Sequence, residues 1–416
     1  MTRTGYITRP DFSVPPSSPS PKTPGRRLIV PALLPALFVV LLSLPSSPLA
    51  QTRPGGRSIV LNAPIYLLVE VSSGRVIVEK SVDQPHPPAS IVKIMTMLLV
   101  MDAIDQGEIA LEDVAVISAR ASRIGGSQAY LAEDEEMTVR DLLKAVAIKS
   151  ANDASTALAE HVSGEVEDFV DRMNDRAIEL GMKSTVFQTP HGLPPGPGQE
   201  ADVTSARDVM IMSRELILKY PKILEYTGLK QDSLRGGKFR LDNTNKLVGR
   251  MTGVDGLKTG YTRDAGFGLV ATASRSGLRF ISVVMGAKSG KQRTRDSTRL
   301  LSHGFSSFRN YLAAKAGQEM AQIKVPLGMT EEVVAEMGED FRVLIRRADI
   351  RQLKFKVSPL AELTAPIEAG EKIGTYVALL DGEIVGEAPL VARQSVEKAN
   401  LVIRFFRWLL ALLNIH

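Results

Sequence analysis

The sequence predicts an α/β domain, in which a mixed sheet carries a long helical insertion, then a small all-β domain and a C-terminal amphipathic helix. Apolar strand-like runs stand near both ends of residues 65–287, with helical periodicity between them. Short alternating runs fill the chain after about residue 319, and residues 400–416 combine a broad apolar face with a narrow polar stripe. We place the segments at residues 1–50, 55–315, 318–392 and 394–416.

The first segment, residues 1–50, has the pattern of an export signal. Arg26 and Arg27 precede an apolar run over 28–44 and small residues up to Ala50, which is typical of a secretory signal peptide cleaved near Gln51. The residues ahead of Arg26 are rich in Ser, Pro and Thr and form a long, disordered n-region. The alternative is an uncleaved anchor, but the apolar run contains two prolines and is short for a span of about 20 residues.

Strand and helix signals alternate through the predicted α/β domain. A Ser-Ser-Gly turn joins two strand-like runs into a hairpin, and Thr138 is placed to cap the start of a helix. The expected strands are 66–71, 76–80, 268–273 and 280–287, and the expected helices are 89–104, 139–148, 153–161, 165–180, 205–218 and 294–308.

The third segment reads as β-structure with no catalytic residues of its own. Short alternating runs at 322–325, 341–345 and 353–357 are separated by polar turns. Asp381-Gly382 between two further runs is a strong hairpin signal.

The C-terminal segment predicts a helix lying in a membrane interface. One narrow stripe holds Asn400, Arg404, Arg407, Ala411 and Asn414, and the opposite face holds Leu401, Phe405, Trp408, Leu409 and Leu412. Spanning is disfavoured because each arginine would cost about 2.5–3.5 kcal/mol inside the membrane. The alternative is a terminal helix packed on its own domain.

Composition excludes several classes of function. The formal charge of +5 is small for 416 residues and no basic stripe is interleaved with aromatics, so we expect no nucleic-acid partner. The absence of cysteine excludes disulfides and thiolate chemistry. The five histidines are scattered with no His-x-x-x-His pair, and we therefore expect neither a metal nor another cofactor.

Three short motifs occur in an order that predicts serine acyl transfer. They are Ser90-Ile-Val-Lys93, Ser150-Ala-Asn152 and Lys258-Thr-Gly260. Each is weak alone, since Ser395-Val-Glu-Lys398 repeats the first pattern elsewhere in the chain. Their order, their separations and their positions at the starts of predicted elements together make the hypothesis specific.

The spacing of these motifs has a chemical reason. Lys93 lies three residues after Ser90 on the same helical face, so a neutral Lys93 can take the hydroxyl proton, and the cation of Lys258 would lower its pKa. Ser150 can relay a proton to the leaving amine, and Asn152 can offer its amide to a substrate. The strand that Lys258 opens can pair with an extended peptide.

Other residues complete the predicted site. Gly260 allows the substrate strand to approach closely, and the helix start at Ser90 favours negative charge. The backbone N–H groups of Ser90 and Tyr261 are the natural oxyanion donors.

Five stretches resemble the low-molecular-mass penicillin-binding proteins of the D-alanyl-D-alanine carboxypeptidase family, over about residues 65–308. They are Pro88-Ala-Ser-Ile-Val-Lys-Ile-Met-Thr96, Gly125-Gly-Ser-Gln128, Ser150-Ala-Asn-Asp-Ala154, Pro190-His-Gly-Leu193 and Gly253-Val-Asp-Gly-Leu-Lys-Thr-Gly-Tyr-Thr262. The resemblance implies a serine β-lactamase/D,D-peptidase-like fold. It also implies removal of the terminal D-alanine from peptidoglycan pentapeptide stems, with β-lactam antibiotics as covalent inhibitors.

The resemblance also implies a role for each site residue. Ser90 would be the acyl-ester nucleophile, Lys93 the general base and Ser150 the proton relay, while Asn152, Lys258 and Thr259 would bind substrate. Arg293 matches the arginine that holds the terminal carboxylate, with Arg295 as the alternative. Lys149 stands where a neutral residue is more usual, and Arg263 where an acidic one is expected.

Three other functions compete with this interpretation. A β-lactamase would need Glu-x-x-x-Asn between the second and third motifs, and none occurs there. A D,D-endopeptidase would use the same residues, and the sequence does not exclude it. A non-catalytic wall-binding protein would be expected to lack Ser90 or Lys93. We expect an exported protein, held peripherally at the periplasmic face of the cytoplasmic membrane.

Overall fold

The computed structural model describes residues 59–412, so the expected signal peptide at residues 1–50 lies outside the described residues. The α/β region has the strands β1 (Ile65–Glu70), β2 (Val76–Lys80), β7 (Val254–Thr262), β8 (Gly266–Arg275) and β9 (Leu278–Ala287). Its helices are α1 (Lys93–Asp105), α2 (Ala119–Arg123), α3 (Val139–Lys144), α4 (Asn152–Ser163), α5 (Val166–Glu179), α6 (Ala206–Lys219), α7 (Ile223–Thr227) and α8 (Gly290–Ser307). Two small hairpins, β3 (Val114–Val116) with β4 (Glu136–Thr138) and β5 (Gln231–Leu234) with β6 (Phe239–Asp242), complete it.

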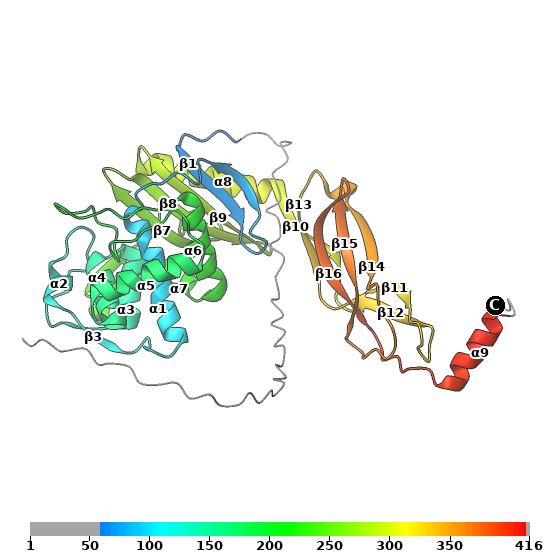
Figure 1. Cartoon of the computed structure of the whole chain (residues 1–416). Helices are drawn as coiled ribbons and strands as arrows, with labels where there is room; N and C mark the ends of the chain where they lie inside the picture. The colour runs from blue at the N-terminus through cyan, green and yellow to red at the C-terminus, as the bar shows by residue number, and fades with distance from the viewer. Residues whose placement is uncertain (1–58, 413–416) are drawn as a thin grey trace, which may run out of the picture. The chain divides into compact units, whose positions relative to one another are not determined.

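The predicted α/β class is confirmed, because one sheet carries a helical insertion between its second and third strands in sequence (Figure 1). The strand order is β2-β1-β9-β8-β7. The expectation of mixed strand directions is wrong, since every pair of neighbours in this sheet is antiparallel. Three of the four pairs, β1–β2, β7–β8 and β8–β9, are hairpins, and a hairpin reverses the chain, while the long-range β1–β9 pair is antiparallel as well.

Both faces of the sheet are buried, which explains its long apolar runs. Along β1, Leu67 and Val69 join the core cluster shared with the inserted helices, whereas Leu68 joins the cluster that includes α8. Successive strand side chains point to opposite faces, so alternate residues of β1 supply the two cores.

Two helices of the insertion, α1 and α3, overlap the ranges 89–104 and 139–148 expected from the sequence. Residues 93–103 of α1 are all buried, so this helix is surrounded by protein on every side. The Thr138 hydroxyl accepts the backbone N–H of Asp141 at 3.1 Å, which confirms the predicted cap of α3.

The β-region contains β10 (Phe308–Ala314), β11 (Glu319–Lys324), β12 (Glu332–Met337), β13 (Phe341–Arg346), β14 (Lys354–Pro359), β15 (Lys372–Leu380) and β16 (Glu383–Ala392). Its larger sheet has the order β11-β12-β16-β15-β14, and β10 pairs with β13. Asp381 and Gly382 between β15 and β16 both have positive φ, at 51° and 89°, as the predicted tight hairpin requires. Because β10 pairs with β13, the β-structure begins before the expected residue 318.

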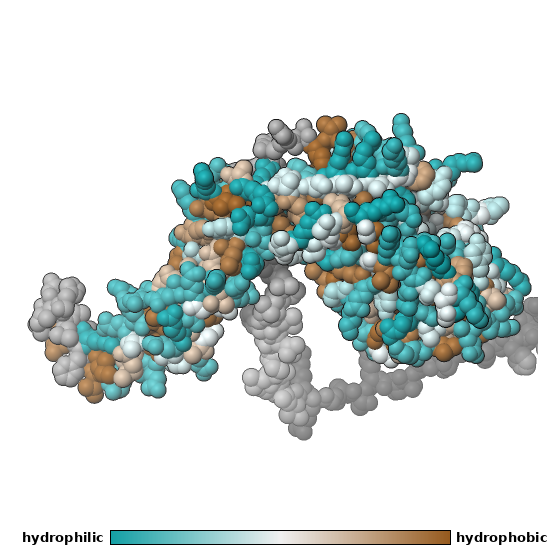
Figure 2. Space-filling view, turned by 180° about the vertical axis from the view of Figure 1, so that it is seen from behind, coloured by the Kyte–Doolittle hydropathy of each residue, from teal (hydrophilic) through white to brown (hydrophobic). Residues whose placement is uncertain are grey.

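The last described element is α9 (Leu401–Leu412), which begins after Asn400 caps the N–H of Ile403 at 2.9 Å. Leu401, Val402 and Phe405 are 79%, 62% and 58% exposed. Arg407 does not stand free beside the other polar residues, because it donates to the carbonyl oxygens of residues 328 and 329 at 2.7 and 2.9 Å. No helix among the described residues has the length and apolar character needed to cross a membrane. Elsewhere, exposed apolar residues are scattered among polar ones on the face shown in Figure 2.

Candidate active site

Ser90 and Lys93 meet where a 3₁₀ turn, Ala89–Val92, runs into α1. Side chains three residues apart eclipse one another in such a turn, and the Lys93 Nζ lies 3.0 Å from the Ser90 Oγ. Ala89 has a φ of +48°, and a Cβ on Gly192 would lie 2.0 Å from the Ala89 carbonyl oxygen. A glycine is therefore required at 192 to close this turn, which places Ser90 beside Lys93.

The Lys93 ammonium position is fully buried and has two further acceptors. Its Nζ lies 2.7 Å from the Asn152 Oδ1 and 2.6 Å from the His191 carbonyl oxygen. Burial lowers the Lys93 pKa well below the ordinary lysine value, and the positive charge of Lys258 lowers it further. Asp202 and Asp153 oppose this shift, but burial dominates. A neutral amine is therefore favoured beside the serine hydroxyl.

The second motif lies between two helices, as the sequence predicts. A π-helical turn, Ala145–Lys149, follows α3, and Ser150 then adopts the left-handed conformation with a φ of 65° before α4 begins. The Ser150 Oγ accepts the Lys258 Nζ at 2.7 Å. Asn152 is held at both ends of its amide, because its Nδ2 donates to the Gly125 carbonyl oxygen at 2.7 Å.

The third motif lies inside β7 rather than at its start, because the strand already begins at Val254. Pairing with β8 from that residue onward extends the strand ahead of Lys258. β7 is the edge strand of its sheet, so its free side can receive an extended peptide. Burial, and then the charge of Arg293, lower the pKa of Lys258 to about 7.

The predicted oxyanion donors belong to segments that touch one another. A Cβ on Gly260 would lie 2.8 Å from the Pro88 carbonyl oxygen and 3.3 Å from the backbone nitrogen of Ile91. The missing side chain thus lets β7 approach the turn that carries Ser90. The backbone N–H groups of Ser90 and Tyr261 remain the predicted oxyanion donors.

Arg293 lies against β7, and Arg295 does not contact this strand through any hydrogen bond of the described residues. The Arg293 guanidinium donates to the carbonyl oxygens of Gly260 and Gly268, both at 3.1 Å. Burial lowers its pKa, although it stays charged at neutral pH because arginine titrates far above that range. Arg295 is half-exposed and points to Asp296 at 3.8 Å. The geometry therefore favours Arg293 as the carboxylate-binding arginine.

Sequence reasoning assigned no role to three residues that touch this site. Thr244 accepts the Thr259 hydroxyl at 2.9 Å, Ser127 accepts the Asn152 backbone N–H at 2.7 Å, and His191 supplies the carbonyl for Lys93. Burial, followed by the charge of Lys93, lowers the pKa of the His191 imidazole to about 3. The only sequence signals were Gly-Gly-Ser and Pro-His-Gly, whose glycines have positive φ at 126 and 192.

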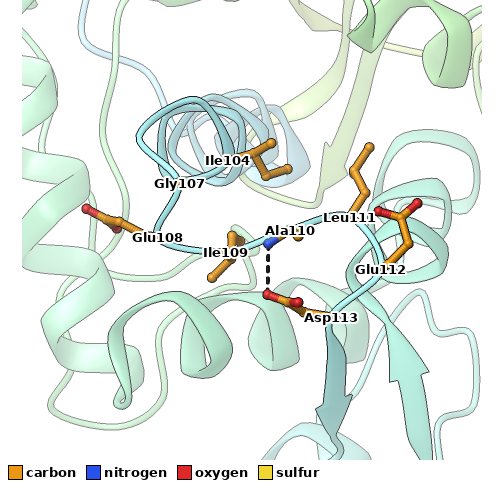
Figure 3. A pocket seen from close by; sticks show the side chains of 8 residues that line it. All are labelled: Ile104, Gly107, Glu108, Ile109, Ala110, Leu111, Glu112 and Asp113. Carbon is orange, nitrogen blue, oxygen red and sulfur yellow. Dashed lines mark hydrogen bonds between the residues drawn. The ribbon is translucent and has the colours of Figure 1, made fainter.

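One hollow of the described surface is lined by residues that take no part in this chemistry. Its lining consists of Ile104 and residues 107–113, and it contains a turn in which the Asp113 carboxylate accepts the Ala110 N–H at 2.8 Å (Figure 3). None of its residues belongs to the three motifs. Among the described residues, no three His, Asp or Glu side chains gather in a way that could hold a metal ion.

The fold and this site define a serine enzyme of the D,D-peptidase class. A family model for D-alanyl-D-alanine carboxypeptidase matches residues 51–289, and one for the penicillin-binding protein 5 C-terminal domain matches residues 308–398. The chain belongs to the D-alanyl-D-alanine carboxypeptidase family.

Individual relatives agree with this assignment. D-alanyl-D-alanine carboxypeptidase DacF of Bacillus subtilis is 38% identical over 89% of this chain and 96% of its own. The crystal structure of penicillin binding protein 5 from Haemophilus influenzae is 34% identical, with a TM-score of 0.70 over 83% of this chain and 100% of its own. Penicillin-Binding Protein D2 from Listeria monocytogenes, in its ampicillin bound form, is 33% identical, with a TM-score of 0.55 over 60% of this chain and 100% of its own.

Proposed function

We propose that this enzyme trims the terminal D-alanine from peptidoglycan pentapeptide stems outside the cytoplasmic membrane, through an acyl-enzyme on Ser90. It is a serine-type D-alanyl-D-alanine carboxypeptidase. The observation that carries the assignment of Ser90 is its 3.0 Å contact with a fully buried lysine whose pKa is held low.

The contacts of Lys93 fit the first step of this reaction. A neutral amine has two N–H groups, and the two shortest contacts, to Asn152 and His191, can take both. The lone pair then faces the Ser90 hydroxyl and can accept its proton as the Oγ attacks the carbonyl carbon of the penultimate D-alanine. The oxyanion forms beside the N–H groups of Ser90 and Tyr261.

Release of the leaving group uses the second motif. The Ser150 hydroxyl lies 2.7 Å from the Lys258 Nζ. It passes its proton to the amine of the departing D-alanine as the C–N bond breaks, and it takes a replacement proton from the charged Lys258. The resulting ester on Ser90 is then hydrolysed by water. A penicillin would form an ester on the same serine by opening of its β-lactam amide, and the Listeria relative solved in its ampicillin bound form supports this proposal for β-lactams.

The test is the Ser90→Ala variant, measured for labelling by fluorescent penicillin and for release of D-alanine from a pentapeptide ending in D-Ala-D-Ala. Both activities are expected to disappear, because among the described residues no other hydroxyl contacts the Lys93 Nζ. Ser395→Ala is a matched control, since Ser395 and Lys398 repeat the Ser-x-x-Lys spacing outside the catalytic region. Penicillin labelling that survives in Ser90→Ala would show that the nucleophile is another residue.

We also propose a peripheral location at the periplasmic side of the membrane, with α9 as the attachment. Leu401, Val402 and Phe405 expose an apolar surface on this helix. Such a surface enters the headgroup boundary of a bilayer without spanning it. Arg404, exposed on the same helix, adds attraction to anionic lipids.

A further inference from the structure

One exposed aromatic residue beside the active site has an unusual backbone. Tyr130 has a φ of +54°, and among the described residues it is the only aromatic one with a positive φ. A bulky side chain makes this conformation unfavourable, so it persists only where neighbouring groups enforce it.

The side chains of Asp153 and Arg235 hold the backbone around Tyr130 in this conformation. The carboxylate of Asp153, which is completely buried, accepts the N–H groups of the residues on either side of Tyr130 at 3.0 and 3.1 Å. Arg235 donates to the carbonyl oxygens of Ala129 and Tyr130 at 3.1 and 2.9 Å and is itself paired with Glu135. Both the N–H groups and the carbonyl oxygens of this turn are therefore held by side chains.

The ring that this turn presents is left in solvent. Tyr130 is 68% exposed, although its ring meets the Phe239 ring edge-on at 6.1 Å and 73°. Arg235 lies over the same Phe239 at 5.4 Å, so the support of the Tyr130 ring is itself held in place. Scattered exposed apolar residues are ordinary on a protein surface. An exposed aromatic ring is unusual, however, when it is carried by a strained turn in which four backbone groups are held by side-chain hydrogen bonds.

The turn stands at the wall of the catalytic site. Ser127 accepts the N–H of Asn152, whose side chain contacts Lys93. Tyr130 follows Ser127 by three residues, so their Cα atoms lie no more than about 11 Å apart. The four stem residues between the sugar and the reacting carbonyl span at most about 14 Å. A stem whose far end reaches Ser90 can therefore bring the sugar at its other end to this wall.

We propose that the Tyr130 ring is a stacking platform for a sugar ring of the glycan strand that carries the stem peptide. This inference rests on the proposed function. A hexosamine ring has an apolar C–H face bordered by hydroxyl groups, and a tyrosine combines a large apolar face with a polar tip. The backbone clamp keeps the platform rigid, so that little freedom is lost when the sugar binds.

The test compares one stem peptide in two forms, free and attached to its disaccharide. Tyr130→Gly and Tyr130→Asn remove the ring and tolerate a positive φ, so both variants are expected to fold with a melting temperature at or above that of the native protein. For the disaccharide pentapeptide we expect kcat/KM to fall by about 3- to 10-fold, the range of an aromatic contact. For the free pentapeptide we expect it to stay within about twofold.

Tyr130→Phe keeps the aromatic face and is expected to retain the preference for the disaccharide substrate. Ile178→Asn is the surface control, since Ile178 is 76% exposed on α5, and it should change neither substrate. Equal losses on the two substrates would mean that Tyr130 contacts the peptide or only shapes the wall, and no loss would also overturn the proposal. If the native enzyme cleaves neither substrate, the proposed function itself fails, and this outcome is distinct from a failure of the platform.

Discussion

The two lysines of the site are both removed from water, but they differ in which charge acts on them. Burial is the main cause of the lowered pKa of each lysine. The charge of Lys258 lowers the Lys93 pKa further, whereas the charge of Arg293 acts on Lys258, whose pKa is lowered to about 7. Below that pH, Lys258 is charged, helps to keep Lys93 neutral and can attract a carboxylate. Acylation needs neutral Lys93, so its rate rises with pH through the Lys93 pKa, which lies well below that of an exposed lysine.

At the same scale, Arg293→Ala is expected to weaken hydrolysis of peptides with a free terminal carboxylate far more than acylation by an activated ester that lacks it. A charge-assisted hydrogen bond contributes about 1.5–3 kcal/mol, which corresponds to a loss of about 10- to 150-fold. The measurement is kcat/KM on a matched peptide and ester.

Arg295→Ala is the control for Arg293→Ala, because it removes an equal charge two residues away without a contact to β7. It should leave both substrates nearly unchanged. Equal losses in Arg293→Ala on the peptide and the ester would show that this side chain supports the strand and does not bind the carboxylate.

At the scale of elements, regular periodicity predicted most helices and strands, whereas the irregular segments that shape the site were not predictable. Local spacing cannot show that α3 ends in a π-helical turn, that Ser150 is left-handed or that the Lys-Thr-Gly motif lies within β7. These features depend on contacts across the fold, such as the Lys258 bond to Ser150. The motifs identified the reactive residues because the chemistry requires particular side chains at those positions. The loop around Ser127 contacts the site mainly through its backbone, which places little constraint on residue type, so no recognisable pattern in the sequence indicated this role.

The loop that supports Asn152 yields a prediction at this scale. Asp153→Asn should lower stability by about 1–3 kcal/mol, because an amide NH₂ would face backbone N–H donors that the carboxylate now satisfies. The negative charge of Asp153 raises the Lys93 pKa, so its loss should lower that pKa. Acylation should then reach its plateau at a lower pH. Rapid-mixing acylation by a fluorescent penicillin across a pH series measures this shift.

Asp208→Asn separates the electrostatic effect from a general loss of structure. Asp208 is also buried and accepts the Ser184 N–H at 2.8 Å, but it is not among the charges that act on the Lys93 pKa. This variant should lose stability without moving the pH profile. A profile for Asp153→Asn that coincides with the native one would contradict the electrostatic part of the prediction.

At the scale of the whole molecule, the candidate active site and the proposed membrane attachment lie in separate parts of the chain. The contacts of the site join residues near 90, 150, 191 and 258, all within the α/β region and its own cores. The β-region has a core of its own, formed by residues of β10–β16 and the segments beside them. Among the described residues, neither this core nor α9 supplies a hydrogen bond to the three motifs.

Deleting residues 400–416 should therefore release the signal-cleaved protein from membranes while its activity on soluble peptides stays nearly intact. Burial of the apolar face in lipid contributes about 25 cal/mol per Å², and each arginine near anionic headgroups about 1 kcal/mol. Leu401→Asp with Phe405→Asp tests the apolar face alone and should also release the protein, whereas Arg404→Gln should weaken retention only at low salt. Vesicle flotation and D-alanine release, measured on the same preparations, decide the question.

Retention of the truncated protein would refute the attachment by α9. A joint loss of solubility and activity would instead show that the helix is part of its own domain, consistent with the bonds of Arg407 to the loop at residues 328–329.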